Sequence, residues 1–276
     1  MASAISFPVP GDHGSGSLTL AYERRGSGAP LLLLHGIGHH WQAWEPVLDV
    51  LAAEREVVAV DLPGFGASSP LPAGLPYALP TVTAVLDAFC RELGIDRPHV
   101  AGNSLGGLLA LELGREKLVR SVTALSPAGF WSEAERVYAF TALRAMRLAA
   151  RSLPGPAVER LARTTAGRAV LVSSIYARPG RRAPQAAVAE TRALRGATGF
   201  APTLGAGGRV RFTDDVPGVP VTIAWGAKDR LLVPRQGPRA KHTIPAARLL
   251  RLPGCGHVPM SDDPALVARV LLDGSS

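Results

Sequence analysis

The stretch Val100-Ala-Gly-Asn-Ser-Leu-Gly-Gly107 decides the fold, because it predicts a strand, a sharp turn and a helix in immediate succession. Its first residues end a short apolar run, and the leucines from Leu108 onward begin a helical pattern. Ser104 therefore falls at the junction, where a turn can present its hydroxyl as a nucleophile. Gly102 and Gly106 flank it with the spacing G-x-S-x-G, as a strained turn with closely passing backbones requires.

Apolar runs and helical patterns alternate on both sides of this turn. The runs at 30–34 and 57–60 are continuous, as expected of strands that are covered on both faces of a parallel sheet. The order of strands and helices predicts an α/β fold, a mostly parallel sheet flanked by helices. The predicted strands are residues 18–22, 30–34, 57–60, 98–103, 119–125, 219–225 and 248–252.

Several helices between these strands carry signals of their ends. Residues 41–53 form one amphipathic pattern, and a second pattern has Thr81 as its predicted cap and Gly94 as its terminator. Asp263 is the predicted cap of the last helix, with Pro264 at its first position.

The alternation stops between residues 130 and 211, where alanine, arginine and leucine dominate. Further helices are predicted at 158–175 and 185–194. We therefore predict a core formed by residues 1–129 and 212–276, with a helical insertion at 130–211. The first helix of the insertion has an apolar side at Val137, Phe140, Leu143 and Met146.

The positive charge of the chain is concentrated in this insertion. The net charge is +8, and residues 130–212 alone contain 14 arginines and four glutamates. Such a segment either attracts acidic substrates or an anionic membrane surface, or forms a solvated helical face, and we favour the solvated face. Aromatic residues are not interleaved among the arginines, so we predict no nucleic-acid binding.

Two other turns extend the pattern around Ser104. The strand at 30–34 leads into His35-Gly-Ile-Gly38, and the strand at 57–60 leads into Asp61-Leu-Pro-Gly-Phe-Gly-Ala-Ser68. With these turns the chain resembles the α/β-hydrolase fold superfamily, in particular serine hydrolases of an esterase-like branch with a helical lid. The likeness spans nearly the whole chain outside the insertion, and it implies that the insertion covers the active site. In the second turn, Asp61 is expected to bond nearby backbone groups.

The resemblance also implies a catalytic triad. Serine needs an adjacent base to become a nucleophile, and histidine, with an ordinary pKa of about 6.5, suits that task when a carboxylate orients it. The family order is Ser, then Asp or Glu, then His, each following a strand, and Ser104, Asp229 and His257 match it. By the same likeness, the backbone N–H groups of Ile37 and Leu105 form the oxyanion hole.

Each triad residue has a simpler interpretation. Ser104 as an ordinary helix cap leaves the flanking glycines unexplained. Asp229 could be a turn residue and His257 a packed loop residue, but the loop 126–129, the family's other acid position, contains no carboxylate. The remaining acids near this part of the chain precede a strand or begin a helix, so we do not select them: Asp214, Asp215, Asp262 and Asp263.

Other reactive side chains near these turns receive a structural interpretation. His35, His39 and His40 lack supporting acids or cysteines at a metal-binding spacing, so we predict ordinary loop histidines. Cys255 lies close to His257 in sequence, and we interpret it as a small packing residue.

Substitutions within the motifs narrow the family branch. Serine at 104, where dehalogenases and epoxide hydrolases of this fold use aspartate, argues against both chemistries. Asn103 and Gly107 resemble carbon–carbon bond hydrolases of ring-cleavage products, but those enzymes usually carry tryptophan after the catalytic histidine and this chain has Val258. That function is therefore the alternative, and the HGGG loop of a major lipase and esterase branch is also missing.

Composition indicates a soluble protein. No apolar run approaches the roughly 20 residues of a membrane-spanning helix, and the first residues lack the pattern of a secretory signal. Only Cys90 and Cys255 are present, which suits a reducing compartment, so we expect a cytoplasmic protein.

Together, these observations predict a hydrolase of a carboxylic ester or similar small acyl substrate, acting through an acyl-enzyme without cofactor or metal. A non-catalytic ligand receptor on the same fold is the alternative of another class. The sequence makes no prediction of the oligomeric state.

Overall fold

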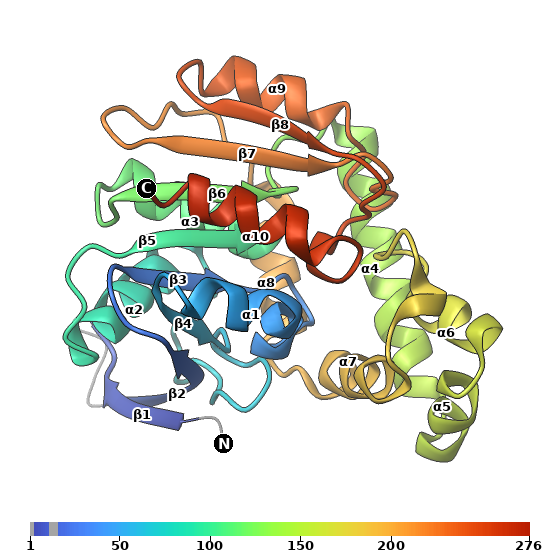
Figure 1. The fold of residues 1–276 in the computed structure, drawn as a ribbon. Coiled ribbons are helices and arrows are strands. Elements are labelled where there is room, and N and C mark those ends of the chain that lie inside the picture. The colour runs from blue at the N-terminus through green and yellow to red at the C-terminus, as the bar shows by residue number, and fades with distance from the viewer. Residues whose placement is uncertain (1–2, 11–15) are drawn as a thin grey trace.

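The predicted strands lie side by side in one sheet of eight strands in the computed structural model, which describes residues 3–10 and 16–276 (Figure 1). The spatial order is β1-β2-β4-β3-β5-β6-β7-β8. The first two strands pair antiparallel, and all pairs from β4 to β8 are parallel, which confirms the predicted α/β fold. The strands are β1 (Ser3–Pro8), β2 (Ser17–Arg25), β3 (Pro30–Leu34), β4 (Glu56–Val60), β5 (His99–Asn103), β6 (Ser121–Leu125), β7 (Val221–Gly226) and β8 (Arg248–Leu252).

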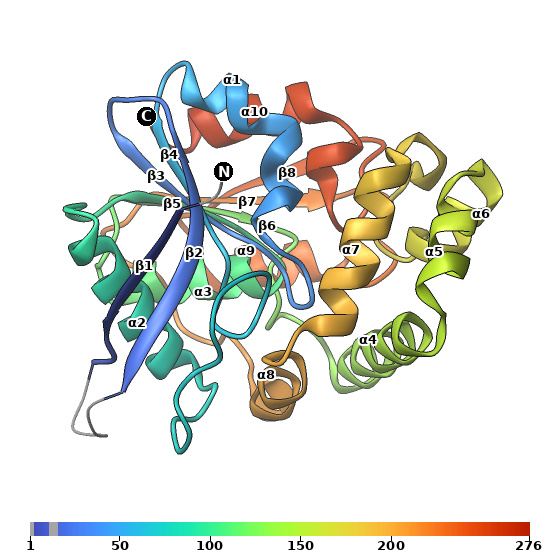
Figure 2. The same ribbon diagram turned by 90° about the horizontal axis from the view of Figure 1, so that it is seen from below.

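The central strands are buried because helices cover both faces of the sheet. Every residue of β6 and β7 is buried, and so is every residue of β3 and β4 after the first, which explains the continuous apolar runs of β3 and β4. Helices α1 (Glu45–Ala52) and α10 (Pro264–Asp273) cover one face, and α2 (Leu79–Glu92) and α3 (Leu105–Arg115) cover the other (Figure 2). Helix α9 (Gln236–Thr243), which the sequence patterns did not predict, packs against β7 and β8.

The predicted ends of these helices are correct in two of three places. Asp263 caps α10 by accepting a hydrogen bond of 3.0 Å from the backbone N–H of Leu266, and Gly94, at φ +71°, follows the end of α2. The prediction that Thr81 caps α2 is wrong, because this helix begins at Leu79 with Pro80 in its first turn. Proline is favoured there because its missing N–H would have no helical partner.

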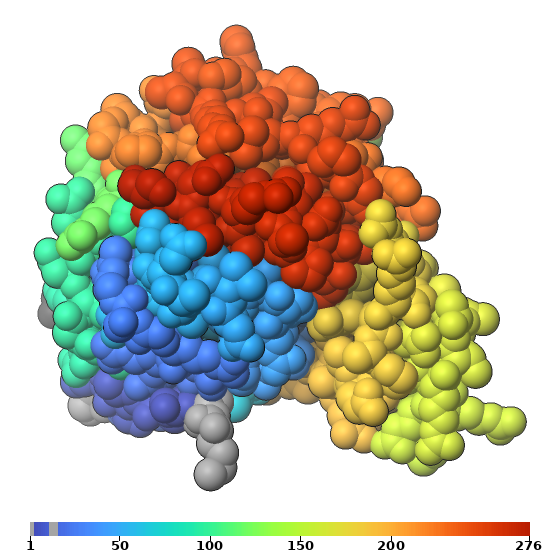
Figure 3. Space-filling view, viewed as in Figure 1, coloured from blue at the N-terminus to red at the C-terminus, as the bar shows by residue number. Residues whose placement is uncertain are grey.

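The segment between β6 and β7 is helical, and none of its described residues forms a strand. Its helices α5, α6 and α7 stand out from the sheet and its covering helices (Figure 3). The helix predicted at 158–175 is in fact two helices, because Thr164 caps a new one by accepting from the N–H of Gly167 at 3.0 Å. Its helices are α4 (Glu133–Ser152), α5 (Gly155–Ala162), α6 (Thr165–Val172), α7 (Pro184–Gly196) and α8 (Phe200–Ala206), with short 3₁₀ turns at Pro179–Arg181 and Gly207–Arg209.

The predicted apolar side of α4 is correct only in part. Phe140 is buried, and Leu143 and Met146 pack against the core, but Val137 is 52% exposed. The buried position nearest the start of the helix is instead Glu135, which reaches Arg235 and Arg239 at the edge of α9. In the described residues, no helix is both long and apolar enough to cross a bilayer.

The turn between β5 and α3 depends on close backbone contacts, as the G-x-S-x-G spacing predicts. A Cβ atom at Gly106 would lie 2.1 Å from the carbonyl oxygen of Leu34, and one at Gly102 would lie 2.0 Å from that of Gly106. Both distances are far below van der Waals contact, so helix α3 can approach the strands only with glycine at these positions.

We predict that Gly106→Ala destabilises the fold by about 3 kcal/mol or more, because backbone atoms, not a flexible side chain, must move to admit the methyl group. Urea unfolding followed by circular dichroism measures the change. Gly205→Ala is the matched control, since a Cβ atom at this position in α8 meets no atom within 4 Å. Equal urea midpoints for wild type and Gly106→Ala would contradict the close-approach argument.

Candidate active site

Ser104 lies in a strained turn whose backbone is fixed from several sides. Its φ of +58° and ψ of −114° are unusual for a residue other than glycine. The Ser104 N–H donates to the carbonyl of Leu125 at 3.0 Å, and its carbonyl accepts from Leu108 and Ala128 at 3.0 and 3.1 Å. These bonds hold the strained backbone conformation of Ser104 in place.

His257 and Asp229 come from the loops after β8 and β7, as predicted, and form a buried pair. Nδ1 of His257 lies 2.8 Å from Oδ2 of Asp229, and both side chains are nearly fully buried. The other carboxylate oxygen of Asp229 accepts from the backbone N–H groups of Leu231 and Leu232 at 2.9 and 2.8 Å. The carboxylate is thus held in place, and its bond to Nδ1 leaves Nε2 as the ring nitrogen available for other chemistry.

Ser104 and His257 line the same cavity. Among the described residues, the Ser104 hydroxyl makes no hydrogen bond, and so none to His257. Such bonds often tighten only when substrate is present.

Two polar side chains that the sequence patterns did not assign hold the His257 loop. The Asn103 amide donates to the carbonyl of His257 at 2.8 Å and to that of Leu125 at 3.1 Å. Asp262 accepts from the N–H of Gly256 at 2.8 Å and from the N–H groups of Ala177 and Arg178 beyond α6. The residue before the nucleophile is therefore tied to the loop that carries the base.

The loop after β3 approaches the nucleophile closely. A Cβ atom at Gly36 would lie 3.2 Å from Cβ of Ser104, so this loop passes directly over the turn. Within the described chain, the N–H groups of Ile37 and Leu105 donate to no protein acceptor. Two free donors beside Ser104 are what an oxyanion site needs.

Buried hydrogen bonds hold this loop and the loop after β4. His35 Nε2 accepts from the N–H of Leu62 at 3.0 Å while its Nδ1 bonds the carbonyl of Gly36, and burial lowers its pKa to about 3. Asp61 accepts from the N–H groups of Trp41 and Ala67 at 2.6 and 2.9 Å, as expected for that turn, and burial raises its pKa to about 6. His35 is thus a structural link between the two loops.

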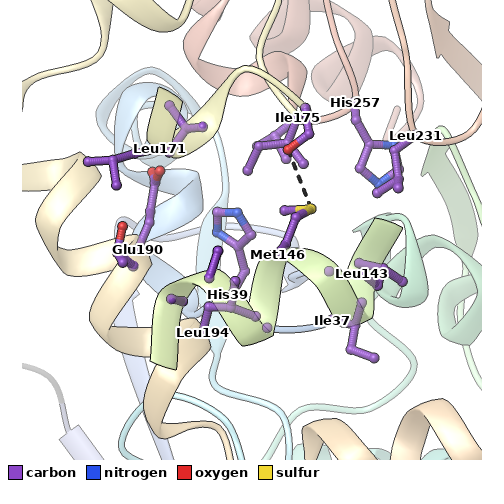
Figure 4. Close-up of a pocket in the computed structure, with 18 of the residues that line it drawn as sticks. Ile37, His39, Leu143, Met146, Leu171, Ile175, Glu190, Leu194, Leu231 and His257 are labelled. Carbon is purple, nitrogen blue, oxygen red and sulfur yellow. Dashed lines mark hydrogen bonds between the residues drawn. The ribbon is translucent and has the colours of Figure 1, made fainter. Parts of the chain in front are cut away.

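The cavity above Ser104 has a volume of about 310 Å³ and a mostly apolar lining. The segment between β6 and β7 supplies much of its wall, with Leu143 and Met146 from α4, Leu171 from α6 and Leu194 from α7 (Figure 4). Leu231 lines it beside His257, and Ile37 also belongs to the lining. Apolar walls around a few polar groups are typical of sites for small organic ligands.

Other reactive groups near the site have structural environments. No cluster of three or more histidine, cysteine or acidic side chains in the described residues is arranged to hold a metal ion. Cys255 is fully buried, and burial, followed by the charge of Asp262, raises the pKa of its thiol to about 12. The thiol therefore stays protonated, in agreement with a packing role.

Comparison with known sequences identifies relatives over most of the chain. A protein of Mycobacterium tuberculosis (strain H37Rv), itself uncharacterized, is 30% identical over 262 residues, which cover 89% of this chain and 74% of that protein. A pimeloyl-[acyl-carrier protein] methyl ester esterase of Aeromonas hydrophila is 36% identical over 121 residues, covering 43% of this chain and 46% of the esterase.

Solved structures share the fold at lower identity. An esterase from Thermogutta terrifontis superimposes with a TM-score of 0.77 at 20% identity, covering 99% of this chain and 97% of the esterase. A meta-cleavage product hydrolase from Pseudomonas fluorescens IP01 gives a TM-score of 0.73 at 18% identity, covering 93% of both chains.

The sequence model of the α/β hydrolase fold matches residues 29–264, which include all the loops described above. This match covers most of the chain, and the sheet order and the turn at Ser104 agree with it. The chain belongs to the α/β-hydrolase family of enzymes.

Proposed function

We propose that this protein is a serine hydrolase that cleaves a carboxylic ester or a similar small acyl compound. The observation that carries the proposal is the convergence on one cavity of Ser104, strained and nearly buried, with the hydrogen-bonded pair of His257 and Asp229. The methyl ester esterase among the relatives is consistent with this substrate class.

The geometry supports a two-step mechanism. His257 Nε2 removes the proton of the Ser104 hydroxyl as its oxygen attacks the substrate carbonyl carbon, and Asp229 stabilises the resulting imidazolium. The N–H groups of Ile37 and Leu105 stabilise the oxyanion. His257 then donates the proton to the leaving alcohol, and a water molecule that it deprotonates releases the acid and regenerates Ser104.

We propose that residues 130–211 act as a lid, inserted between core regions 1–129 and 212–276. Apolar side chains of α4, α6 and α7 line the cavity, so these helices separate a bound acyl or alcohol group from water. The ion pairs of Glu135 with Arg235 and Arg239 attach the base of α4 to the core.

Carbon–carbon bond hydrolysis remains the competing function within the family. Asn103 is one of the residues in which this chain resembles those hydrolases. The Asn103 amide holds the carbonyl of His257, and this role suits ester hydrolysis as well as carbon–carbon bond hydrolysis. Val258, where those enzymes carry tryptophan, favours the ester. A receptor would bind its ligand without turnover, which distinguishes it from both enzymes.

We also propose a cytoplasmic location. Both cysteines, Cys90 and Cys255, are free and buried in the structure, as suits a reducing compartment.

We expect Ser104→Ala to abolish covalent labelling by a fluorophosphonate probe and to lower kcat/KM for nitrophenyl esters by at least about 10⁴-fold, because no other group can form the acyl-enzyme. Labelling is measured by intact-protein mass spectrometry, and turnover by absorbance. Ser174→Ala is the control, since this second serine lines the same cavity but lies outside the strained turn, and it should still be labelled.

Labelling of Ser104→Ala at the wild-type rate would contradict the assignment of the nucleophile. Labelling of wild type without ester turnover, combined with cleavage of a ring-fission diketone, would favour the carbon–carbon hydrolase. Ligand binding by folded protein without labelling or turnover would favour the receptor.

Asn103→Leu should lower kcat roughly 10- to 100-fold, because the carbonyl of His257 loses its amide donor and the base moves relative to Ser104. We expect KM to change by less than about threefold, since the Asn103 amide is engaged with two backbone carbonyls of the protein, and the labelling rate to fall in parallel with kcat. Steady-state kinetics and probe labelling check this. A loss confined to the melting temperature, with kcat unchanged, would mean that Asn103 only supports the fold.

Activity on neutral esters should change less than about twofold between low and moderately high salt, because several lid arginines are engaged within the protein. Arg147 donates to the carbonyl of Leu194 at 2.9 Å, and Arg195 donates to that of Ala150 at 2.7 Å. Initial rates across a sodium chloride series measure the effect. A steep loss of activity with salt would instead support an electrostatic role for the lid in substrate capture.

A further inference from the structure

Besides His257, two titratable side chains lie in the lining of the cavity. His39 lies in the loop after β3 and Glu190 lies on α7, and both line the cavity that contains Ser104. They are 9% and 5% exposed. In Figure 4, Glu190 and His257 lie on opposite sides of the cavity, with His39 between them.

Glu190 is held by one carboxylate oxygen only. Its Oε1 accepts from the hydroxyl of Tyr176 at 2.8 Å and from Nε of Arg182 at 2.7 Å, in an ion pair whose side chains are 5% exposed for Glu190 and 10% exposed for Arg182. Burial, followed by the charge of Glu190, raises the pKa of Tyr176 well above its ordinary value, so the phenol keeps its proton and donates. Oε2 of Glu190 is buried and has no partner among the described residues.

One ring nitrogen of His39 also lacks a hydrogen-bond partner among the described residues. Its Nδ1 is buried and bonds no described residue. Burial, and next the neighbouring His40, lower the pKa of His39 well below its ordinary value, so the ring is neutral. A neutral imidazole has one N–H donor and one acceptor nitrogen.

Unpaired polar atoms are costly in a buried site and uncommon in folded proteins. Here two of them, from elements far apart in sequence, belong to residues that line one cavity whose other walls are mainly leucine, isoleucine, methionine and valine. A few convergent polar groups in an apolar pocket select the orientation and chemistry of a ligand.

We propose that His39 and Glu190 form a polar subsite that binds a neutral hydroxyl group of the substrate, on the side of the cavity away from His257. The inference rests on the proposed hydrolase function and narrows its substrate class to esters with an apolar chain that bears a hydroxyl group. The substrate hydroxyl donates to Oε2 of Glu190, and its oxygen accepts from the imidazole N–H of His39.

The charges in the cluster exclude other polar groups. Glu190 and Arg182 neutralise each other, and His39 and Tyr176 are uncharged. A substrate carboxylate would face the free oxygen of Glu190, and an ammonium group would be buried without a counter-charge of its own. A hydroxyl group, which both donates and accepts, satisfies both unpaired side chains at no cost in buried charge.

The test compares three nitrophenyl esters of matched chain length that end in a hydroxyl, a methyl or a methyl-ketone group. We expect wild type to prefer the hydroxyl ester over the methyl ester by about tenfold or more in kcat/KM. His39→Leu should remove most of this preference without loss of melting temperature, because the histidine ring bonds nothing in the protein that the leucine would leave unpaired.

Glu190→Gln tests the other half of the subsite. The glutamine oxygen can still accept from Tyr176 and Arg182, which directs its amide N–H₂ into the cavity, so the ketone ester should gain relative to the hydroxyl ester. Leu194→Ala is the matched control on α7, since it changes an apolar part of the same wall and should affect all three esters in parallel. If Glu190→Gln does not fold, the ester preference measured for His39→Leu tests the subsite by itself.

Equal kcat/KM values of wild type for the hydroxyl and methyl esters, or an undiminished preference in His39→Leu, would overturn the subsite. Failure of the hydrolase proposal looks different, since none of the three esters would then be cleaved in a Ser104-dependent manner. In that case, isothermal titration calorimetry with alkanols and with their methyl ethers tests the subsite. Equal affinities of wild type for the alkanol and the ether would overturn it.

Discussion

The close approach of helix α3 to the sheet is the constraint on which the rest of the site depends. With glycine at 102 and 106, the helix begins directly above the carboxyl ends of β3 and β5, and the intervening Ser104 must adopt a positive φ. The strain of this turn, of order 1–3 kcal/mol, is offset by the hydrogen bonds of its backbone to β6 and α3. The same turn leaves the N–H of Leu105 free beside the hydroxyl.

The parallel sheet then brings distant parts of the chain to this turn. Because β3, β5, β7 and β8 all end at one edge, the loops that carry Ile37, Ser104, Asp229 and His257 meet there. Topology alone places a loop only approximately, and buried hydrogen bonds complete the positioning. Asn103 ties the His257 loop to β5, and Asp262 ties it to the chain beyond α6. Asp262 therefore links the helical insertion directly to the loop that carries His257.

Sequence patterns predicted the core well because each core feature is local. The continuous apolar runs, the spacing of glycines around Ser104 and the cap at Asp263 depend on neighbouring residues, and the structure confirms them. The incorrect predictions arise where distant contacts or competing local signals determine the structure. Pro80 moves the start of α2 ahead of Thr81, Thr164 divides a predicted helix, and Val137 faces solvent because Glu135 is buried against arginines of another segment.

The polar cluster in the cavity shows why the lid is hardest to interpret from sequence. His39 was grouped with His35 and His40, although His35 links two backbone loops and His39 bonds nothing in the described chain. Glu190 was counted only as one of four acids in an arginine-rich segment. Burial distinguishes them, because an exposed glutamate on a helix is solvated, whereas a buried carboxylate with one unpaired oxygen lacks a hydrogen-bond donor. Since the described part of the chain does not supply that donor, the proposed subsite narrows the substrate class further than the family fold does.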